Sequence, residues 1–142
     1  MPQIRKYEDA CDYLRKNGLR FSRQRMVVIN EMFFNKEDKT HFKLNEILQL
    51  IKDNHKNINI SSASLTNILK GLCNSGHIRE VHLNKPYYDT NTDHHLHFYD
   101  ELAGKLMDVK DSGYFQYIRD NVEVPQGYEI KDVNCIIDLD KF

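Results

Sequence analysis

Cysteine is scarce in this sequence of 142 residues, which contains three, at Cys11, Cys73 and Cys135. Because they are odd in number, widely spaced and form no C-x-x-C pair, they indicate neither a disulfide framework nor a thiolate zinc site. Long apolar runs are also missing, and those present are far too short to span a membrane. The first residues contain no apolar signal segment. We therefore expect a cytoplasmic protein with no membrane partner.

Charge is nearly balanced over the whole chain, with a net charge of −1, but it is distributed unevenly. Residues 1–85 contain 15 Lys and Arg against 9 Asp and Glu, a balance of +6. Residues 86–142 contain 5 Lys and Arg against 12 Asp and Glu, a balance of −7. The basic first part suggests contact with a polyanion such as DNA, although chance clustering of solvated charge gives the same excess.

Residues 1–90 have the pattern of a winged helix-turn-helix domain. Ser22 can cap the second of its expected helices, and Ser61 or Ser62 the fourth. A hairpin is expected after the helices, from His77–Leu83 and Pro86–Thr90, and this order of elements makes a winged helix. Helical spacing relates Ile4, Tyr7, Cys11 and Leu14; then Met26, Val27, Ile29, Met32 and Phe33; then Leu44, Ile47, Leu48 and Ile51; and finally Leu65, Ile68, Leu69 and Leu72.

Residues 91–142 have the pattern of a small α/β unit. We expect strands at His95–Tyr99, Lys105–Val109 and Val133–Leu139, and a helix at Ser112–Asn121. A unit of roughly fifty residues is below the size that usually folds well alone, and a second copy would complete its core. The chain is therefore expected to be an α+β protein that forms a homodimer through this second domain.

The start of the fourth helix is the expected recognition surface, because the second helix of a helix-turn-helix meets base edges with its N-terminal residues. Ala63 is expected on the inner, apolar face. Asparagine can pair with adenine, hydroxyls can contact bases or phosphates, and Lys and Arg suit phosphates and the minor groove. Any one of these residues is equally a cap or a solvated side chain, but together they favour DNA binding. The candidates are Ser62, Ser64, Thr66, Asn67 and Lys70, with Arg20, Arg23 and Arg25 around the start of the second helix.

Five scattered residues form a candidate metal site. His95 and His97 alternate on an expected strand, so both side chains leave the same face. Asp89 ends the hairpin, Asp108 lies on the neighbouring strand, and His41 precedes the third helix. Imidazoles and carboxylates bind Fe(II), Mn(II) or Zn(II). A cation held by residues of both domains would fix the angle between them, and thereby the spacing of two recognition helices in a dimer.

Two other hypotheses use the same residues. The first is a metalloenzyme, which needs an open coordination position and a general base in a pocket. A set of five protein ligands leaves little room for a substrate, so we expect no enzyme. The second is a winged-helix DNA-binding dimer whose metal site is vestigial.

The chain resembles the ferric uptake regulator (Fur) superfamily of metal-responsive transcription factors from about Tyr13 to Leu139. The segment Gly18–Arg25 is similar to the opening of the family's second helix. Ile60–Leu72 and Gly76–Arg79 resemble its recognition helix and the entry to its wing. The five candidate ligands fall on the family's regulatory metal site, so the resemblance implies a dimeric repressor that responds to a divalent metal.

Within the superfamily the chain looks most like the iron response regulator (Irr) branch. The resemblance is carried by Tyr88–Asn91, His97–Tyr99 and Val124–Ile130. Members of this branch respond to haem and iron, so haem becomes a second candidate effector. Its ligands would come from His94, His95 and His97.

Two departures from the family concern other metals. Asp100 and Ala103 stand where most members have the first C-x-x-C of a structural zinc site, so we expect no structural zinc. Leu96, Phe115 and Val133 stand at the partner positions of a further metal site, so we expect that site to be missing as well.

Overall fold

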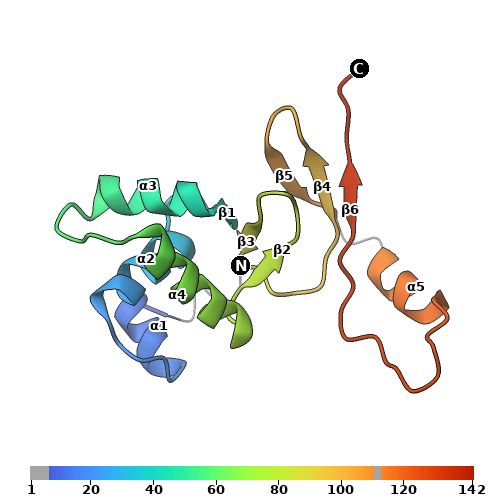
Figure 1. The fold of residues 1–142 in the computed structure, drawn as a ribbon, viewed down its shortest axis with the longest axis horizontal. Coiled ribbons are helices and arrows are strands. Elements are labelled where there is room, and N and C mark those ends of the chain that lie inside the picture. The colour runs from blue at the N-terminus through green and yellow to red at the C-terminus, as the bar shows by residue number, and fades with distance from the viewer. Residues whose placement is uncertain (1–6, 111–112) are drawn as a thin grey trace. The chain divides into compact units, whose positions relative to one another are not determined.

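The computed structural model of this chain describes residues 7–110 and 113–142. Ile4 and Ser112, which the sequence assigns to helices, lie outside the described residues. The chain divides into two compact units between Thr92 and Asp93, called here the N-terminal and the C-terminal unit (Figure 1). Each combines helix with a three-stranded sheet, so the α+β class is confirmed. No helix within the described ranges combines the length and the apolar character needed to cross a bilayer.

The N-terminal unit has four helices followed by a hairpin, as the sequence predicts for a winged helix, and one further short strand between the second and third helices. Caps of the predicted type start two of the helices: the side chain of Ser22 accepts a hydrogen bond from the Arg25 amide, and that of Ser61 from the Ser64 amide. The elements are α1 (Ala10–Lys16), α2 (Arg23–Phe33), β1 (His41–Lys43), α3 (Leu44–Asn54), α4 (Ser62–Asn74), β2 (Arg79–Val81) and β3 (Tyr87–Asp89).

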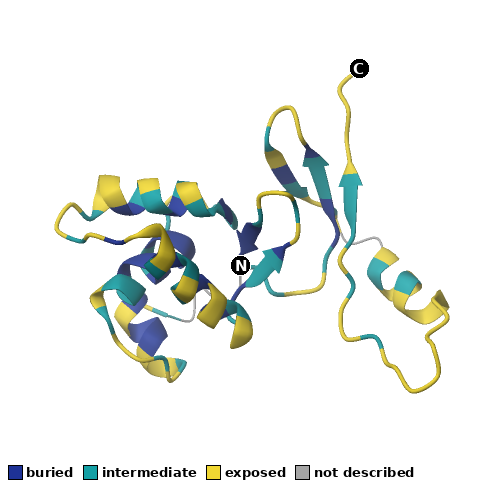
Figure 2. Cartoon of the chain, viewed as in Figure 1, coloured by how far each residue is buried: buried dark blue, intermediate teal, exposed yellow. Residues whose placement is uncertain are grey.

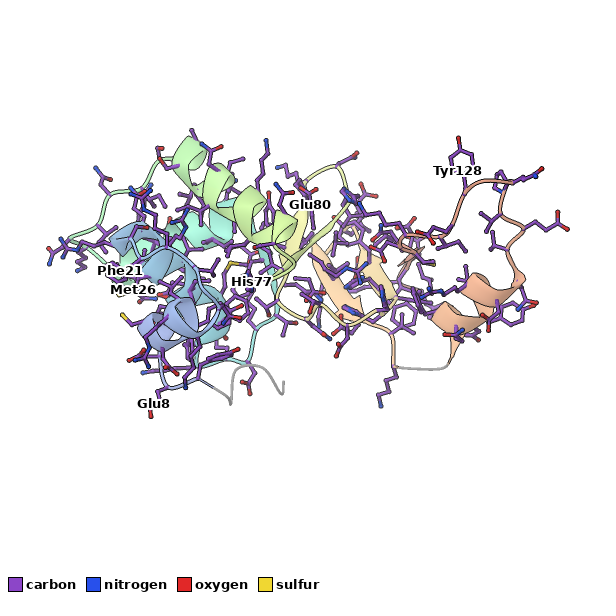
Figure 3. The ribbon with its side chains drawn as sticks, turned by 90° about the horizontal axis from the view of Figure 1, so that it is seen from below. Glu8, Phe21, Met26, His77, Glu80 and Tyr128 are labelled. Carbon is purple, nitrogen blue, oxygen red and sulfur yellow. The ribbon has the colours of Figure 1, made fainter. Side chains whose placement is uncertain are left out.

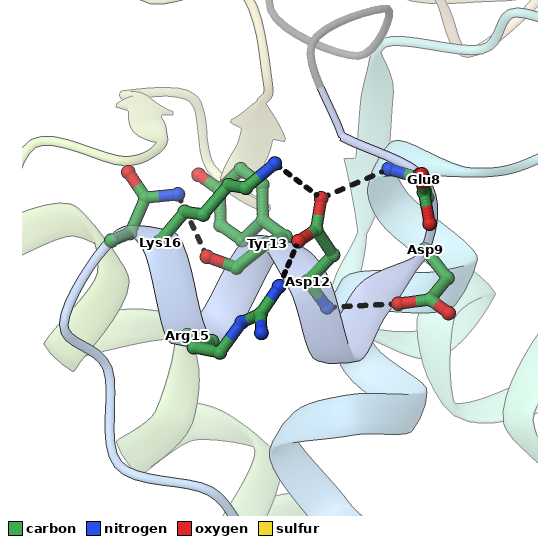
Figure 4. Close-up of polar contacts among 7 residues, drawn as sticks. Glu8, Asp9, Asp12, Tyr13, Arg15 and Lys16 are labelled. Carbon is green, nitrogen blue, oxygen red and sulfur yellow. Dashed lines mark hydrogen bonds and ion pairs between the residues drawn. The ribbon is translucent and has the colours of Figure 1, made fainter.

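Helix α1 is shorter than predicted. Asp9, in extended backbone conformation, caps the helix by accepting from the Asp12 amide, so Tyr7 lies outside it. Asp12 is itself buried, and its carboxylate faces Arg15 and Lys16 and accepts from the amide of Glu8 (Figure 4). The apolar residue at position 7 therefore continues the spacing of a helix without belonging to it.

The sheet of the N-terminal unit contains one strand that the sequence did not predict. Its order is β1-β3-β2, and both pairings are antiparallel. The predicted hairpin is present as β2 and β3, but each of its strands has three residues, fewer than expected. The unpredicted strand is β1, which pairs His41 with Asp89.

The apolar core lies almost entirely in the N-terminal unit (Figure 2). It is made by residues of all four helices, together with Phe42 of β1, which is fully buried. Its largest fully buried side chains include Phe33, Leu14, Ile47 and Leu65. This core fixes the helices and β1 against one another.

The C-terminal unit has little apolar core of its own. Its sheet has the order β5-β4-β6, in which β5 is antiparallel and β6 parallel to β4. Leu96 and Leu106 are its buried apolar residues among those described, and helix α5 buries none. The elements are β4 (His97–Asp100), β5 (Lys105–Asp108), α5 (Tyr114–Asn121) and β6 (Ile136–Asp138).

Candidate metal centre

The N-terminal unit supplies an imidazole beside a carboxylate, called here the His41–Asp89 pair. The two residues are directly opposite in the antiparallel pairing of β1 and β3. The Nε2 atom of His41 lies 3.2 Å from Oδ2 of Asp89. Residues opposite each other on one face of a sheet are close enough for their side chains to interact, so the pairing itself produces this contact.

Asp89 is held firmly in place. Its side chain is 1% exposed, and its Oδ1 accepts a hydrogen bond of 2.8 Å from the Asn91 amide. The next residue continues the ladder, because the Thr90 amide donates to the Thr40 carbonyl. A buried carboxylate is costly unless a charge or hydrogen bonds compensate it. The backbone therefore orients one oxygen of Asp89, and the other faces His41.

The C-terminal unit supplies a second group, called here the His95–His97–Asp108 cluster. His97 and Asp108 are opposite each other in the pairing of β4 and β5, a register that the sequence analysis did not specify. The Oδ1 atom of Asp108 lies 3.2 Å from Nε2 of His95 and 3.4 Å from Nε2 of His97. The two imidazole rings have centroids 4.4 Å apart. Three potential ligand atoms thus converge on one region.

The position of His95 differs from the prediction, because β4 begins at His97 and His95 lies in the preceding loop. A backbone contact orients its ring: Nδ1 is 2.5 Å from the Asp93 carbonyl oxygen. A carbonyl oxygen only accepts, so Nδ1 carries the hydrogen and the lone pair is left on Nε2. Metal-binding histidines are commonly oriented by such an outer contact.

These donors fit a divalent cation of intermediate hardness. The His41–Asp89 pair offers one nitrogen and one carboxylate, and the His95–His97–Asp108 cluster offers two nitrogens and one carboxylate. Such nitrogen and oxygen ligands, without thiolates, suit Fe(II), Mn(II) and Zn(II). Each group by itself is therefore a chemically suitable part of a metal site.

His94 has different partners from the other two histidines of its segment. Its ring stacks on Phe115, with centroids 4.4 Å apart and an interplanar angle of 10°, and its Nδ1 lies 3.3 Å from Oδ1 of Asp132. A cavity of about 80 Å³ lies beside His94 and His95. The three histidines proposed for haem therefore belong to two local arrangements.

The predicted DNA-binding residues of α4 are partly accessible. Ser62, Asn67 and Lys70 are exposed, whereas the hydroxyl of Thr66 donates to the Ser62 carbonyl at 2.8 Å. Ser64 is half-buried and its hydroxyl accepts from that of Ser61. Ala63 is exposed, so its expected inner position is wrong. The start of α4 therefore presents a small, polar surface.

The three arginines around the start of α2 differ in solvent exposure. Arg20 and Arg23 are exposed, but Arg25 is half-buried and donates to the Arg20 carbonyl at 3.0 Å. Arg25 thus supports the turn that carries Arg20. Phe21, which is labelled in Figure 3, follows Arg20 in the sequence and is 59% exposed.

The chain is similar to known proteins in sequence and in fold. The sequence model of the ferric uptake regulator family matches residues 16–137. The ferric uptake regulator from Pseudomonas aeruginosa, solved with manganese, is 16% identical with a TM-score of 0.68, over 93% of this chain and 97% of that chain.

Two further solved structures share the fold. The regulator from Francisella tularensis, solved with iron, is 17% identical with a TM-score of 0.68, over 86% of this chain and 91% of that chain. The Vibrio cholerae regulator is 18% identical with a TM-score of 0.69, over 92% of this chain and 98% of that chain. No protein with a curated description matches the sequence.

Proposed function

The chain belongs to the ferric uptake regulator family, and from this we propose that it is a metal-responsive, DNA-binding transcriptional regulator whose effector cation joins its two units. The observation that carries the proposal is the division of suitable ligands between the units. The His41–Asp89 pair lies on one side of the boundary at Thr92, and the His95–His97–Asp108 cluster lies on the other.

A shared cation would act by selecting one arrangement of the two units. When bound, it supplies positive charge that holds carboxylates and imidazoles from both units together. The residues themselves determine the response, because an effector shifts an equilibrium only through its different affinity for the alternative arrangements. In a dimer, the selected arrangement would set the distance between the two α4 helices, which DNA reads as half-site spacing.

Fe(II) and Mn(II) are the cations we propose, and Zn(II) would bind in vitro. The donor set supports these metals because it consists of imidazoles and carboxylates. The relatives from Pseudomonas aeruginosa and Francisella tularensis were solved with manganese and with iron.

We further propose that the chain belongs to the Irr branch, on the residues that carry that resemblance. Haem is then the second candidate effector. His94 would have to leave Phe115 and Asp132 to act together with His95 and His97. The cavity of about 80 Å³ beside it is also far smaller than the roughly 300–1,000 Å³ of ordinary ligand sites. These two observations favour a metal ion over haem.

DNA is the proposed macromolecular partner, met in the cytoplasm. The exposed Asn67 and Lys70 on α4 and the exposed Arg20 and Arg23 before α2 supply the base and phosphate contacts. The Gln24 side chain donates to the Asn59 carbonyl at 3.3 Å, which ties the start of α2 to the segment that leads into α4. This hydrogen bond links the segments that carry the two groups of residues.

A homodimer through the C-terminal unit completes the proposal. Large exposed apolar side chains are concentrated there: among the described residues all but Phe21 belong to this unit. Tyr128 projects from its loop in Figure 3. Exposed apolar side chains gathered in one unit support the proposal that it meets a second copy of the chain. The residues are Leu102, Tyr114, Tyr117, Val122, Val124, Tyr128, Leu139 and Phe142.

Duplexes selected from a random pool in the presence of Mn(II) provide the test. Binding of the selected duplex is measured while Mn(II), Fe(II) or haem is titrated into the metal-free chain. We expect Fe(II) or Mn(II) to raise affinity at least tenfold and His95→Ala/His97→Ala to abolish the response. His82→Ala, which alters an exposed histidine outside both groups, should keep it. DNA affinity that ignores all three effectors, and is the same in the double variant, contradicts the proposal and leaves a vestigial site.

A metalloenzyme is the second candidate, because two histidines and one carboxylate are also the ligands of non-haem iron oxygenases. The small cavity beside His95 argues against it, since a substrate needs room next to the metal. Fe(II)-dependent consumption of oxygen that requires His95 and His97, without any effect of metal on DNA binding, would favour the enzyme.

A further inference from the structure

A cavity of about 640 Å³ opens in the N-terminal unit, and none of the residues proposed to bind metal or DNA is among those that line it. It is lined by the second half of α2, the loop that follows, β1 and α3. Its volume falls within the roughly 300–1,000 Å³ of small-molecule sites. The cavity is therefore large enough for a ligand of its own.

A buried carboxylate lies in the wall of this cavity. The side chain of Glu31 is 7% exposed. Its Oε1 accepts a hydrogen bond of 2.8 Å from the Asn54 amide group and lies 3.2 Å from Nε2 of His55. Among the described residues no donor is recorded for Oε2. A carboxylate has about four lone-pair sites, so Glu31 keeps acceptor capacity for a ligand.

Apolar groups form another part of the wall. Phe34, Phe42 and Leu50 line the cavity, and Phe42 is held in the core. The loop between α2 and β1 is fixed by Asn35, whose side chain donates to the carbonyls of Met32 and Lys39 and accepts from the Lys39 amide. The walls are therefore formed before a ligand arrives, which lowers the entropic cost of binding.

Among the charged residues that line the cavity, Glu31 is the one that we expect to contact a ligand. Lys39 is paired with Glu46, and its Nζ lies 5.3 Å from the centroid of the Phe42 ring, so that ring already has a cation beside it. Lys36 and Glu37 are exposed at the rim. A ligand that donates to a buried carboxylate and covers aromatic carbon must carry a cationic or N–H group on an apolar body. Ammonium groups also interact favourably with aromatic faces.

We propose that this cavity binds a small organic amine, whose ammonium group contacts Oε2 of Glu31 and whose apolar body contacts Phe34 and Leu50, the partly exposed apolar residues of the wall. The site has a direct connection to the rest of the molecule, because Phe42 lies in β1 next to His41. A bound amine would thus lie in a cavity whose wall includes the strand that carries a candidate metal ligand. The site would serve a second, organic effector.

Calorimetric titration of the full, metal-free chain with 2-phenylethylamine tests the site without reference to metal or DNA. The neutral analogue 2-phenylethanol has the same apolar body. We expect the amine to bind at least tenfold more tightly than the alcohol. Glu31→Gln should lose at least tenfold in amine affinity, because glutamine can still accept from Asn54 and His55 but carries no charge. Glu37→Gln, at the rim of the same cavity, should bind the amine as the unmodified chain does.

Three results would overturn the proposal. They are no amine binding at millimolar concentration, equal binding of amine and alcohol, and equal loss of affinity in Glu31→Gln and Glu37→Gln. The comparison of amine with alcohol uses the unmodified chain, so it decides the question even if Glu31→Gln does not fold.

Discussion

His41 of β1 lies directly opposite Asp89 of β3, and 3.2 Å separates Nε2 of the imidazole from Oδ2 of the carboxylate. A short antiparallel pairing thus brings together two residues that are far apart in the sequence. Because the carboxylate is almost fully buried, a positive partner would stabilise it strongly. The pair is therefore well suited to bind a cation that is also held by other ligands.

Substitutions on α4 should distinguish base-specific recognition from non-specific attraction to DNA phosphates. Asn67→Ala is expected to cost about 1–3 kcal/mol on the preferred duplex and to relax the preference at one base pair. Lys70→Ala should weaken binding to all duplexes and reduce the slope of log affinity against log salt concentration by about 1. Fluorescence anisotropy over a range of salt concentrations measures both effects.

Lys131→Ala is the matched control for these variants, since it removes an exposed lysine of the C-terminal unit. It should change neither the preference nor the salt slope. An identical loss in Lys70→Ala and Lys131→Ala would mean that α4 has no special role.

Dimer formation is predicted to depend on the large exposed apolar side chains of the C-terminal unit. Tyr117 is 65% exposed on α5 in the single chain, and a charge introduced there would have to be buried in the interface. Tyr117→Glu should weaken the dimer by at least about 2 kcal/mol, which is more than tenfold in its dissociation constant. Sedimentation velocity at several concentrations measures the change. Phe21→Glu, an equivalent change on the N-terminal unit, should leave the dimer intact; a loss of dimer in that variant alone would refute the assignment.

Asp12 should make the stability of the N-terminal unit depend on pH in the acid range. The Arg15 side chain, the Glu8 amide and Lys16 lower the pKa of Asp12 from 3.8 to about 2 (Figure 4). The folded state therefore binds protons less readily than the unfolded state, and the contribution to stability is fully present above pH 3.8. It is lost as the pH falls through about 2.

Urea denaturation of the unmodified chain and of Asp12→Asn measures this dependence. The difference in free energy of unfolding between the two should shrink as the pH falls below 3.8. Arg15→Ala should shift the loss toward higher pH, because it removes the largest cause of the lowered pKa. A difference that stays constant with pH would show that the ion pairs do not stabilise the fold.

Local signals in the sequence predicted the helices of the N-terminal unit well. Ser22 and Ser61 cap α2 and α4 as expected, because a cap and its helix involve residues three or four positions apart. The same signals do not reveal β1, whose three residues form a strand only because β3 lies beside them. Its pairing is non-local, and no periodicity can appear in so short a segment.

The candidate sites were predictable to different degrees. The sequence pattern predicted Asp108 on the strand next to that of His97, but not that the two residues are opposite each other. It also predicted His95 in the strand, whereas the Asp93 carbonyl orients His95 from a loop. No sequence pattern marks Glu31 as a buried residue or as a residue that binds a ligand. Its burial depends on Asn54 and His55 at the end of α3, a contact that only the packing of α2 against α3 produces.

Equilibrium binding of Mn(II), followed by the electron paramagnetic resonance of the free ion, tests most directly whether both units hold one cation. We predict one ion per unmodified chain, and a loss of at least tenfold in affinity in each of His41→Ala and His97→Ala. The double variant should lose less than the two single losses combined, because each change disrupts the same site. If His41→Ala binds Mn(II) as tightly as the unmodified chain, His41 is not a ligand of the cation and the account is contradicted.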